Sequence, residues 1–385
     1  MQFFSEAALL GRLRLLGVNS LNATIALVLV LALSLAALSQ TAGTQDTKSD
    51  ISKLQAMAEG GDASAQLTLG LAYQNGRGVQ QDDSIAVEWY RKAAAAGNSE
   101  AQSDLGVMYM NGWGVEKDKA EAVRWYHLAA KQKNAHAMFN LGAAYYNGDG
   151  VGIDDVRAYA WFLLAQDAGS QPATDAVQRS EIELGPTILS LGMNYVVEMY
   201  FKGDDLNRDY KEGVQWLRKS AGRGDVQSQL TLAGVLTDGV DLPPDYEEGR
   251  HWCEAALQQK SAMAAYCLGT IYRKGLGVPK DATKALSLLR EAADSGITPA
   301  MEASGEMLAS GDAGKVDRQQ ALMYLIGAIL NGDQGSLSRA AEVRAQMSDK
   351  EWKRTQEEIK RRFRFFDAAK LEAALQSVQP NSSPK

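Results

Sequence analysis

Short runs of apolar residues at helical spacing alternate with polar, glycine-containing stretches along most of the chain. The run AQLTLGLAYQN, which starts at Ala65, places Ala65, Leu69 and Tyr73 on one face of a helix. From Ala86, apolar or small residues recur at the i, i+3, i+7 and i+8 positions of a second run. The pattern predicts two short amphipathic helices joined by a loop that contains glycine.

This helix pair is repeated. Glycines equivalent to Gly76 fall 36 residues apart, with one interval of 55, and an Asp and a small residue follow each glycine by six and ten residues. The seven sets are Gly76, Asp82 and Ala86; Gly112, Asp118 and Ala122; Gly148, Asp154 and Ala158; Gly203, Asp209 and Gly213; Gly239, Asp245 and Gly249; Gly275, Asp281 and Ala285; and Gly311, Asp317 and Ala321. Such self-similarity is typical of a repeat protein.

Each repeated position has a mechanical explanation. A glycine after the last helical turn can adopt the left-handed conformation that ends a helix. The Asp can accept hydrogen bonds from the free N–H groups that begin the next helix. Three residues later Glu121, Glu212, Glu248 and Gln320 predict capping boxes. The small residues allow the two helices to approach closely. We therefore interpret the repeated acid as a helix cap rather than as a catalytic group. The Trp-Tyr pair that follows it in the first two copies, Trp89-Tyr90 and Trp125-Tyr126, is interpreted as core.

The combined pattern A-x-x-x-L-G-x-x-Y-x-x-G-x-G-V-x-x-D-x-x-x-A-x-x-W-Y-x-x-A-A resembles the Sel1-like repeat, a relative of the tetratricopeptide repeat. Residues 65–94 and 101–130 match it nearly throughout, and the resemblance covers roughly residues 50–370. The copies at Gly203, Gly239 and Gly311 lack the second loop glycine. The resemblance implies an all-α fold: a right-handed α-solenoid of about seven helix-turn-helix repeats with capping helices.

The chain divides into eight predicted segments. These are a cytoplasmic segment (1–21), a signal-peptide core or membrane anchor (22–39), a linker (40–48), a cap with three repeats (49–169), an insertion or junction (170–188), four repeats (189–338), C-terminal capping helices (339–375) and a disordered tail (376–385). The cap helix is expected at about 49–59. In the C-terminal part, Ser348 or Asp349 is expected to cap a long helix. Trp352, Ile359, Phe363 and Phe366 share one of its faces. The insertion either joins two blocks or bulges from an uninterrupted solenoid.

The N-terminus predicts export. Residues 22–39 are nearly all apolar, and Arg12 and Arg14 precede them, so residues after this segment are expected outside the cytoplasm. Two outcomes stay open: a soluble periplasmic protein after cleavage, or a protein tethered in the inner membrane through residues 22–39.

Composition argues for a soluble helical protein without an evident reaction centre. The net charge of −7 disfavours a nucleic-acid partner. No HExxH, nucleophile-elbow, P-loop or dinucleotide motif occurs, so we expect no enzyme, no cofactor and no catalytic or metal-binding residue. His127 and His136 are interpreted as helix-surface residues. A zinc site from His251, Cys253 and Cys267 is weak, because residues i and i+2 point to different sides of a helix.

Cys253 and Cys267 are a candidate disulfide between adjacent units. Each lies about seven residues from the turn near Lys260, so antiparallel helices would bring them level, and an exported compartment is oxidising. Proteins with Sel1 repeats use bridges between helices, but at other positions of the repeat. The residues equivalent to Cys267 are Thr68, Asp104, Asn140 and Thr231, which suggests an exposed direction. Both outcomes stay open.

One set of residues is a candidate partner-binding surface. The residue after the tyrosine of the first helix is large and apolar in three middle copies: Met110, Tyr146 and Phe201. Trp113 lies close to Met110 in the following loop. Stacking would align them into an exposed apolar ladder, unless the insertion covers them.

These observations favour a non-enzymatic interaction scaffold or adaptor in the periplasm or cell envelope, which binds a protein or peptide in the groove of its first helices. The resemblance implies adaptor roles in exopolysaccharide export, envelope signalling, motility assemblies or host contact. Two alternatives are a cell-wall-directed or β-lactam-hydrolysing enzyme, as in some cysteine-rich relatives, and a membrane or polysaccharide binder. The latter would act through the basic run KRRFRFF at residues 360–366.

Overall fold

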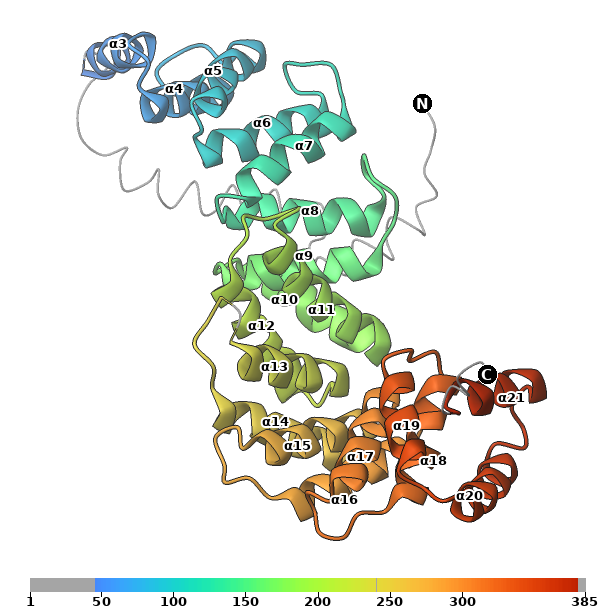
Figure 1. The fold of residues 1–385 in the computed structure, drawn as a ribbon. Helices are drawn as coiled ribbons and strands as arrows, with labels where there is room; N and C mark the ends of the chain where they lie inside the picture. Colours follow the sequence, from blue (N-terminus) through green and yellow to red (C-terminus); the bar gives the residue numbers. More distant parts are fainter. Residues whose placement is uncertain (1–45, 240, 380–385) are drawn as a thin grey trace. The chain divides into compact units, whose positions relative to one another are not determined.

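The computed structural model describes residues 46–239 and 241–379, so the predictions for residues 1–45 and 380–385 lie outside it. Within the described ranges the chain forms nineteen helices and no strand (Figure 1). Seven pairs make up the repeats: α4 (Ala63–Asn75) with α5 (Asp83–Ala95), α6 (Ser99–Asn111) with α7 (Lys119–Ala130), α8 (Ala135–Asn147) with α9 (Asp155–Asp167), α11 (Pro186–Lys202) with α12 (Tyr210–Gly222), α13 (Val226–Asp238) with α14 (Tyr246–Gln258), α15 (Ala262–Lys274) with α16 (Ala282–Asp294), and α17 (Thr298–Ser310) with α18 (Arg318–Leu330).

The predicted caps are confirmed in all seven pairs. Each repeated Asp accepts from a backbone N–H in the first turn of the second helix, for example Asp118 from Glu121 at 2.9 Å. The N–H of each Asp also donates back to a carbonyl near the end of the first helix, as Asp118 does to Tyr109 at 3.0 Å. The seven glycines that end the first helices have φ between 65° and 80°. The repeated acid is therefore architecture.

The capping boxes predicted for Glu121, Glu212, Glu248 and Gln320 are not formed, because the N–H of each capping Asp already donates to a carbonyl of the first helix. The three glutamates bind cations. Glu121 pairs with Arg124, Glu212 pairs with Lys133 of the neighbouring loop, and Glu248 accepts both arms of Arg218 at 2.7 Å. The described chain has a complete capping box at α20, between Ser348 and Glu351.

The two helices of a pair approach closely, as the small residues predict. A Cβ added to Gly106 of α6 would lie 2.5 Å from Cε1 of Tyr126 and 3.1 Å from the carbonyl oxygen of Ala122 in α7. Gly142 meets Phe162 and Ala158 in the same way. Only a residue without a Cβ fits beside these side chains, so the Leu-Gly step sets the contact distance in α4, α6, α8 and α15, where it occurs at the repeated position.

The insertion forms a helix of its own, α10 (Gln171–Glu183). Both α10 and α11 pack against α9, whose residues from Ala158 to Ala165 are all buried. Tyr159 of α9 donates to Glu181 of α10 at 3.2 Å and contacts Gly192 of α11. Packing thus continues through the insertion. The chain divides into two compact units at Trp216–Leu217, inside α12, and residues 170–188 lie within the first unit.

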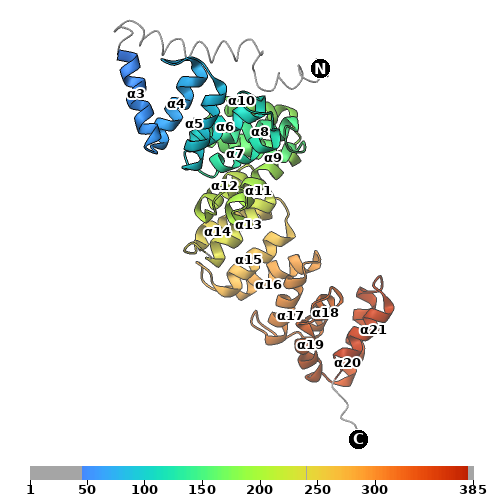
Figure 2. The same cartoon turned by 90° about the horizontal axis from the view of Figure 1, so that it is seen from above.

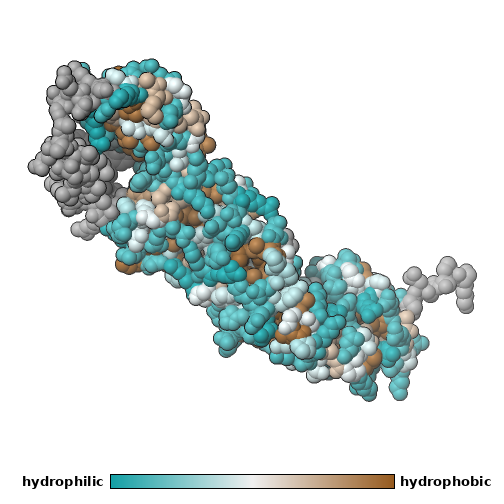
Figure 3. Space-filling model, turned by 90° about the vertical axis from the view of Figure 1, so that its left-hand side faces the viewer, coloured by the Kyte–Doolittle hydropathy of each residue, from teal (hydrophilic) through white to brown (hydrophobic). Residues whose placement is uncertain are grey.

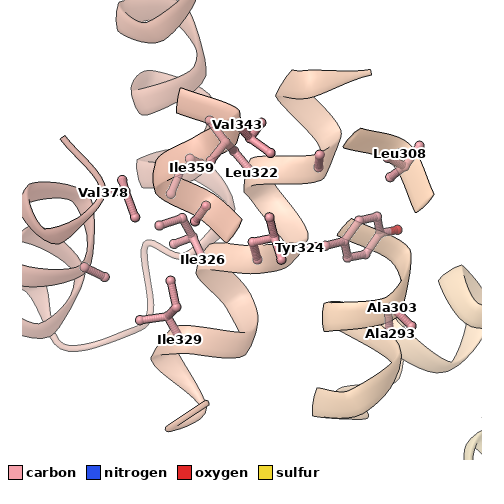
Figure 4. Close-up of a cluster of buried hydrophobic side chains, with 14 of the residues drawn as sticks. Ala293, Ala303, Leu308, Leu322, Tyr324, Ile326, Ile329, Val343, Ile359 and Val378 are labelled. Atoms are coloured by element: carbon pink, nitrogen blue, oxygen red, sulfur yellow. The ribbon is translucent and has the colours of Figure 1, made fainter. Parts of the chain in front are cut away.

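Extra helices cover both ends of the described chain. At the start, α3 (Asp46–Glu59) packs on α4 and buries Ala58. At the other end, α19 (Ser336–Ala345), α20 (Asp349–Arg362) and α21 (Ala368–Ser377) follow α18, and both views show them beside it (Figures 1 and 2). Leu322 and Ile326 of α18 lie among Val343, Ile359 and Val378 from the covering helices and the residue after α21 (Figure 4). No helix in residues 46–239 and 241–379 is both long and apolar enough to span a membrane.

The predicted long C-terminal helix is broken. Trp352, Ile359 and Phe363 are buried as expected. However, α20 ends at Arg362, and Asp367 caps a new helix by accepting from the N–H of Lys370 at 2.9 Å. Phe366 consequently lies in the connection, where it is 41% exposed and its ring meets Phe363 edge-on.

Candidate partner-binding surface

The loops between paired helices stack along one edge of the first unit. A Cβ on Gly114 would lie 2.2 Å from the carbonyl of Asp83, at the start of α5. Gly150 meets the carbonyl of Lys119, at the start of α7, at the same distance. The loops that contain Gly114 and Gly150 therefore pack on the second helix of the preceding pair. The ion pair of Lys119 with Asp149 (2.5 Å) also joins α7 to the loop that contains Gly150. We call residues 76–82, 112–118 and 148–154 the loop edge.

The loop edge exposes two large apolar side chains. Trp113 is 48% exposed and Ile153 is 59% exposed, although both loops are fixed by left-handed glycines and by packing on the neighbouring helix. On the face seen in Figure 3, apolar residues form small patches within a largely hydrophilic surface. A large apolar side chain on a fixed loop is suited to contact a partner.

The other candidate residues of the ladder are less accessible than the sequence suggested. Met110, Tyr146 and Phe201 are half-buried. The ring of Phe201 stacks on Tyr210 with centroids 4.4 Å apart and fills the space beside Gly213 of α12. In the first pair the equivalent residue, Gln74, accepts from the hydroxyl of Tyr90 in α5 at 2.6 Å. This position therefore faces the second helix of its own pair, and Trp113 is the exposed member of the predicted set.

A polar cluster that the sequence analysis missed lies where the loop after α11 meets α7. Asp205 accepts from the hydroxyl of Tyr195 at 2.6 Å and lies 3.8 Å from Nδ1 of His127. Asn207 donates to the carbonyl of Lys131 at 3.0 Å. His127, interpreted from sequence as a surface residue, is half-buried with its ring edge-on to Trp161. The sequence feature that could have indicated this cluster is Asp205, which occupies the position of the second loop glycine in the better-matched copies.

Burial controls the charge state of these groups. Desolvation lowers the pKa of His127, and the charges of Lys131 and Arg157 act in the same direction, while Asp205 opposes them. The imidazole is therefore neutral near pH 7. The cluster can hold the loop against α7 through hydrogen bonds; we find no acid–base pair poised for chemistry in it.

A second unusual carboxyl group lies between the first two pairs. Asp104 of α6 is close to the phenol groups of Tyr90 and Tyr126, and burial with the nearby charge of Glu100 raises its pKa to about 6. Its equivalent in the sixth pair is Cys267.

A disulfide joins Cys253 of α14 to Cys267 of α15, and their Cα atoms are 6.1 Å apart. Cys253 is fully buried and Cys267 is half-buried, so the position that the other copies suggested to be exposed faces the preceding helix. The bridge staples adjacent pairs. Within residues 46–239 and 241–379 no group of three His, Cys, Asp or Glu side chains is arranged to hold a metal ion, and His136 and His251 are exposed.

The basic run at residues 360–366 is largely neutralised by ion pairs. Lys360 binds Glu372 at 2.5 Å, Arg361 binds Glu358, and Arg362 binds Asp294 at 2.7 Å. Arg364 lies over the ring of Phe365, which is 86% exposed. Most of the positive charge that was predicted to bind anionic lipid is therefore paired with carboxylates of the protein itself.

Stacked helix pairs with capped ends and an exposed loop edge define an α-solenoid of the kind that binds other proteins. The Sel1 repeat model matches residues 63–98, 99–134, 135–170, 189–225, 227–261, 262–297 and 298–333, and the chain belongs to the Sel1 repeat family. Proteins of this family generally mediate protein–protein interactions.

Solved structures of Sel1 repeat proteins are similar to this chain. One is c5321, described as a protective antigen in uropathogenic Escherichia coli strains displaying an SLR fold: identity is 30%, coverage is 85% of this chain and 73% of that chain, and the TM-score is 0.43. Another is a Sel1 repeat protein from Oxalobacter formigenes, with 24% identity, coverage of 79% and 83%, and a TM-score of 0.37. No curated protein showed significant similarity.

Proposed function

We propose that the protein is a non-enzymatic adaptor that binds a protein or peptide partner through the loop edge of its first unit. The observation that carries the proposal is the different use of repeated and unrepeated residues. The repeated acids cap helices and the repeated apolar residues fill the interior. Trp113, which replaces Arg77 and Asp149 of the neighbouring copies, serves neither purpose and stays 48% exposed.

The proposed location is the periplasm or cell envelope, either free or tethered through residues 22–39. Two features support it. The apolar segment with Arg12 and Arg14 before it has the pattern of an export signal or anchor. The disulfide between Cys253 and Cys267 suits an oxidising compartment.

Crosslinking capture from native cell envelopes tests the adaptor role. The bait is the full chain, compared with Trp113→Ser and with the control Leu191→Ser, which removes an apolar side chain of equal exposure (48%) from α11 of the same unit. Circular dichroism and urea unfolding establish that both variants are folded. We expect one protein captured by the native chain and by Leu191→Ser, and lost from Trp113→Ser.

Two results would contradict this proposal. Equal capture by all three chains would exclude the loop edge as the contact. Hydrolysis of a chromogenic β-lactam or of cell-wall material by the purified chain, with no protein captured, would exclude the adaptor role itself.

A further inference from the structure

The second unit contains a cleft lined by cations that have few partners. The cleft has a volume of about 510 Å³ and lies between the start of α18 and the face of α20. Lys315, Arg318 and Arg354 line it, and Met347 forms part of its wall. A space of this size is in the range that holds a small ligand or a few side chains of a peptide.

The acids of the cleft are already engaged. Asp317 accepts from the N–H of Gln320 at 3.0 Å as the cap of α18. Glu351 accepts from both the N–H and the hydroxyl of Ser348, at 2.8 and 2.7 Å, and these bonds lower its pKa. Asp317 therefore serves the backbone of its own helix. Glu351 also faces a cation of the cleft, because the charge of Arg318 lowers its pKa further.

The cations of the cleft are less engaged in ion pairs and hydrogen bonds than its acids are. Lys315 and Arg354 are exposed and form no ion pair within the described residues, and Arg318 has one long hydrogen bond, to the amide of Gln346 at 3.4 Å. This contrasts with the neighbouring run at residues 360–366, where Lys360, Arg361 and Arg362 are all paired.

From this geometry we propose that the cleft of Lys315, Arg318 and Arg354 binds carboxylate side chains of an acidic protein segment. Guanidinium groups match the planar, two-oxygen geometry of a carboxylate. Met347 adds an apolar wall, which suits a peptide better than a bare polyanion. The inference rests on the proposed adaptor role and adds a second contact, with a partner of stated chemistry.

Fluorescence anisotropy of a labelled peptide tests the cleft directly. The probe has Glu alternating with Ala, and a matched peptide has Gln in place of Glu. The full chain is compared with K315E/R354E and with the control K280E/K353E, which reverses two exposed, unpaired lysines outside the cleft. Urea unfolding confirms that each variant is folded.

At low ionic strength we expect the native chain to bind the Glu peptide and not the Gln peptide. K315E/R354E should weaken binding by about tenfold, the effect of turning two exposed attractions into repulsions, and the control by no more than about twofold. Equal binding by both variants, or no binding by the native chain, would overturn the proposal. Tighter binding of oligo(dT) than of the Glu peptide would show a nucleic-acid site instead. If K315E/R354E still captures the partner that Trp113→Ser loses, the cleft is refuted while the adaptor role stands.

Discussion

At the scale of single residues, the positions with local roles could be predicted and those with distant partners could not. An Asp that caps a helix needs only the N–H groups two or three residues ahead, so spacing alone identified Asp82 and its equivalents. The partners of Glu212 and Glu248 lie elsewhere in the chain. Lys133 is in the loop between α7 and α8, and Arg218 is in α12, one pair away from Glu248. No local pattern encodes those distances.

Gly106 offers a direct test of the close helix contact. Gly106→Ala would place a methyl group 2.5 Å from the ring of Tyr126, and we expect a loss of about 1–3 kcal/mol in unfolding free energy. Gly222→Ala, where nothing lies within 4 Å, is the control and should leave stability unchanged or raise it by up to about 1 kcal/mol. Equal effects at the two glycines in urea unfolding would show that packing does not require Gly106.

Asp104 predicts a pH-dependent stability. Its pKa is raised from 3.8 to about 6 in the folded chain, so the fold favours the protonated acid. This contribution is complete below about pH 4 and is lost as the pH rises through 6. Asp104→Asn, which never ionises, should therefore be more stable than the native chain by about 1–3 kcal/mol at pH 7.5, with the difference vanishing near pH 4.

Urea unfolding at several pH values measures this difference. Glu116→Gln, which removes an exposed carboxylate from the loop edge, is the control and should show little change. A stability difference between Asp104→Asn and the native chain that stays constant from pH 4 to 8 would contradict the buried-acid account.

At the scale of helices, the distribution of apolar residues indicates how many neighbours a helix has. Most second helices bury one stripe, but α9 and α18 bury nearly every residue over about two turns. Both helices also pack on helices outside the repeat pattern: α9 on α10, and α18 on α19, α20 and α21. The apolar runs were visible in the sequence. The packing of both α10 and α11 on α9 was not, because it depends on three-dimensional fit.

Ile359 tests whether α20 is part of the fold that covers α18. Its side chain is fully buried against α18, so Ile359→Ala should lower the unfolding free energy by about 2–5 kcal/mol. Phe365→Ala, at a side chain that is 86% exposed, should change it by less than about 0.5 kcal/mol. Similar small losses for both variants would mean that α20 is not packed as described.

The disulfide between α14 and α15 closes a loop with a sequence separation of 14 residues. Replacing both cysteines by alanine should cost about 3 kcal/mol under oxidising conditions, the loop-closure value for this length. In dithiothreitol the native chain should approach the stability of the variant. A gap that persists in full under reductant would show that cysteine packing, and not the bond, stabilises this contact.

At the scale of the whole molecule, charge is unevenly distributed along the chain. Residues 46–216 contain 15 Lys and Arg against 24 Asp and Glu, whereas residues 217–385 contain 23 against 22. The two units therefore offer different surfaces: an acidic one that exposes Trp113 on its loop edge, and a nearly neutral one with a cationic cleft. The repeat pattern predicted the fold because each repeat forms one helix pair, and seven such pairs make up most of the described chain. It did not separate Trp113 from the other candidates Met110, Tyr146 and Phe201, because only the packed structure shows which of them is exposed. Arg354 lies in α20, outside the repeats, so the repeat pattern says nothing about it.

We propose that this chain binds a protein through side chains that the repeats do not need for folding. Isothermal titration of the purified full chain with the purified captured partner measures this binding. We predict a saturable complex whose affinity falls at least about tenfold in Trp113→Ser, with the urea midpoint unchanged and Leu191→Ser binding like the native chain. Absence of heat and of complex with the native chain, or identical affinities for all three chains, would contradict the account.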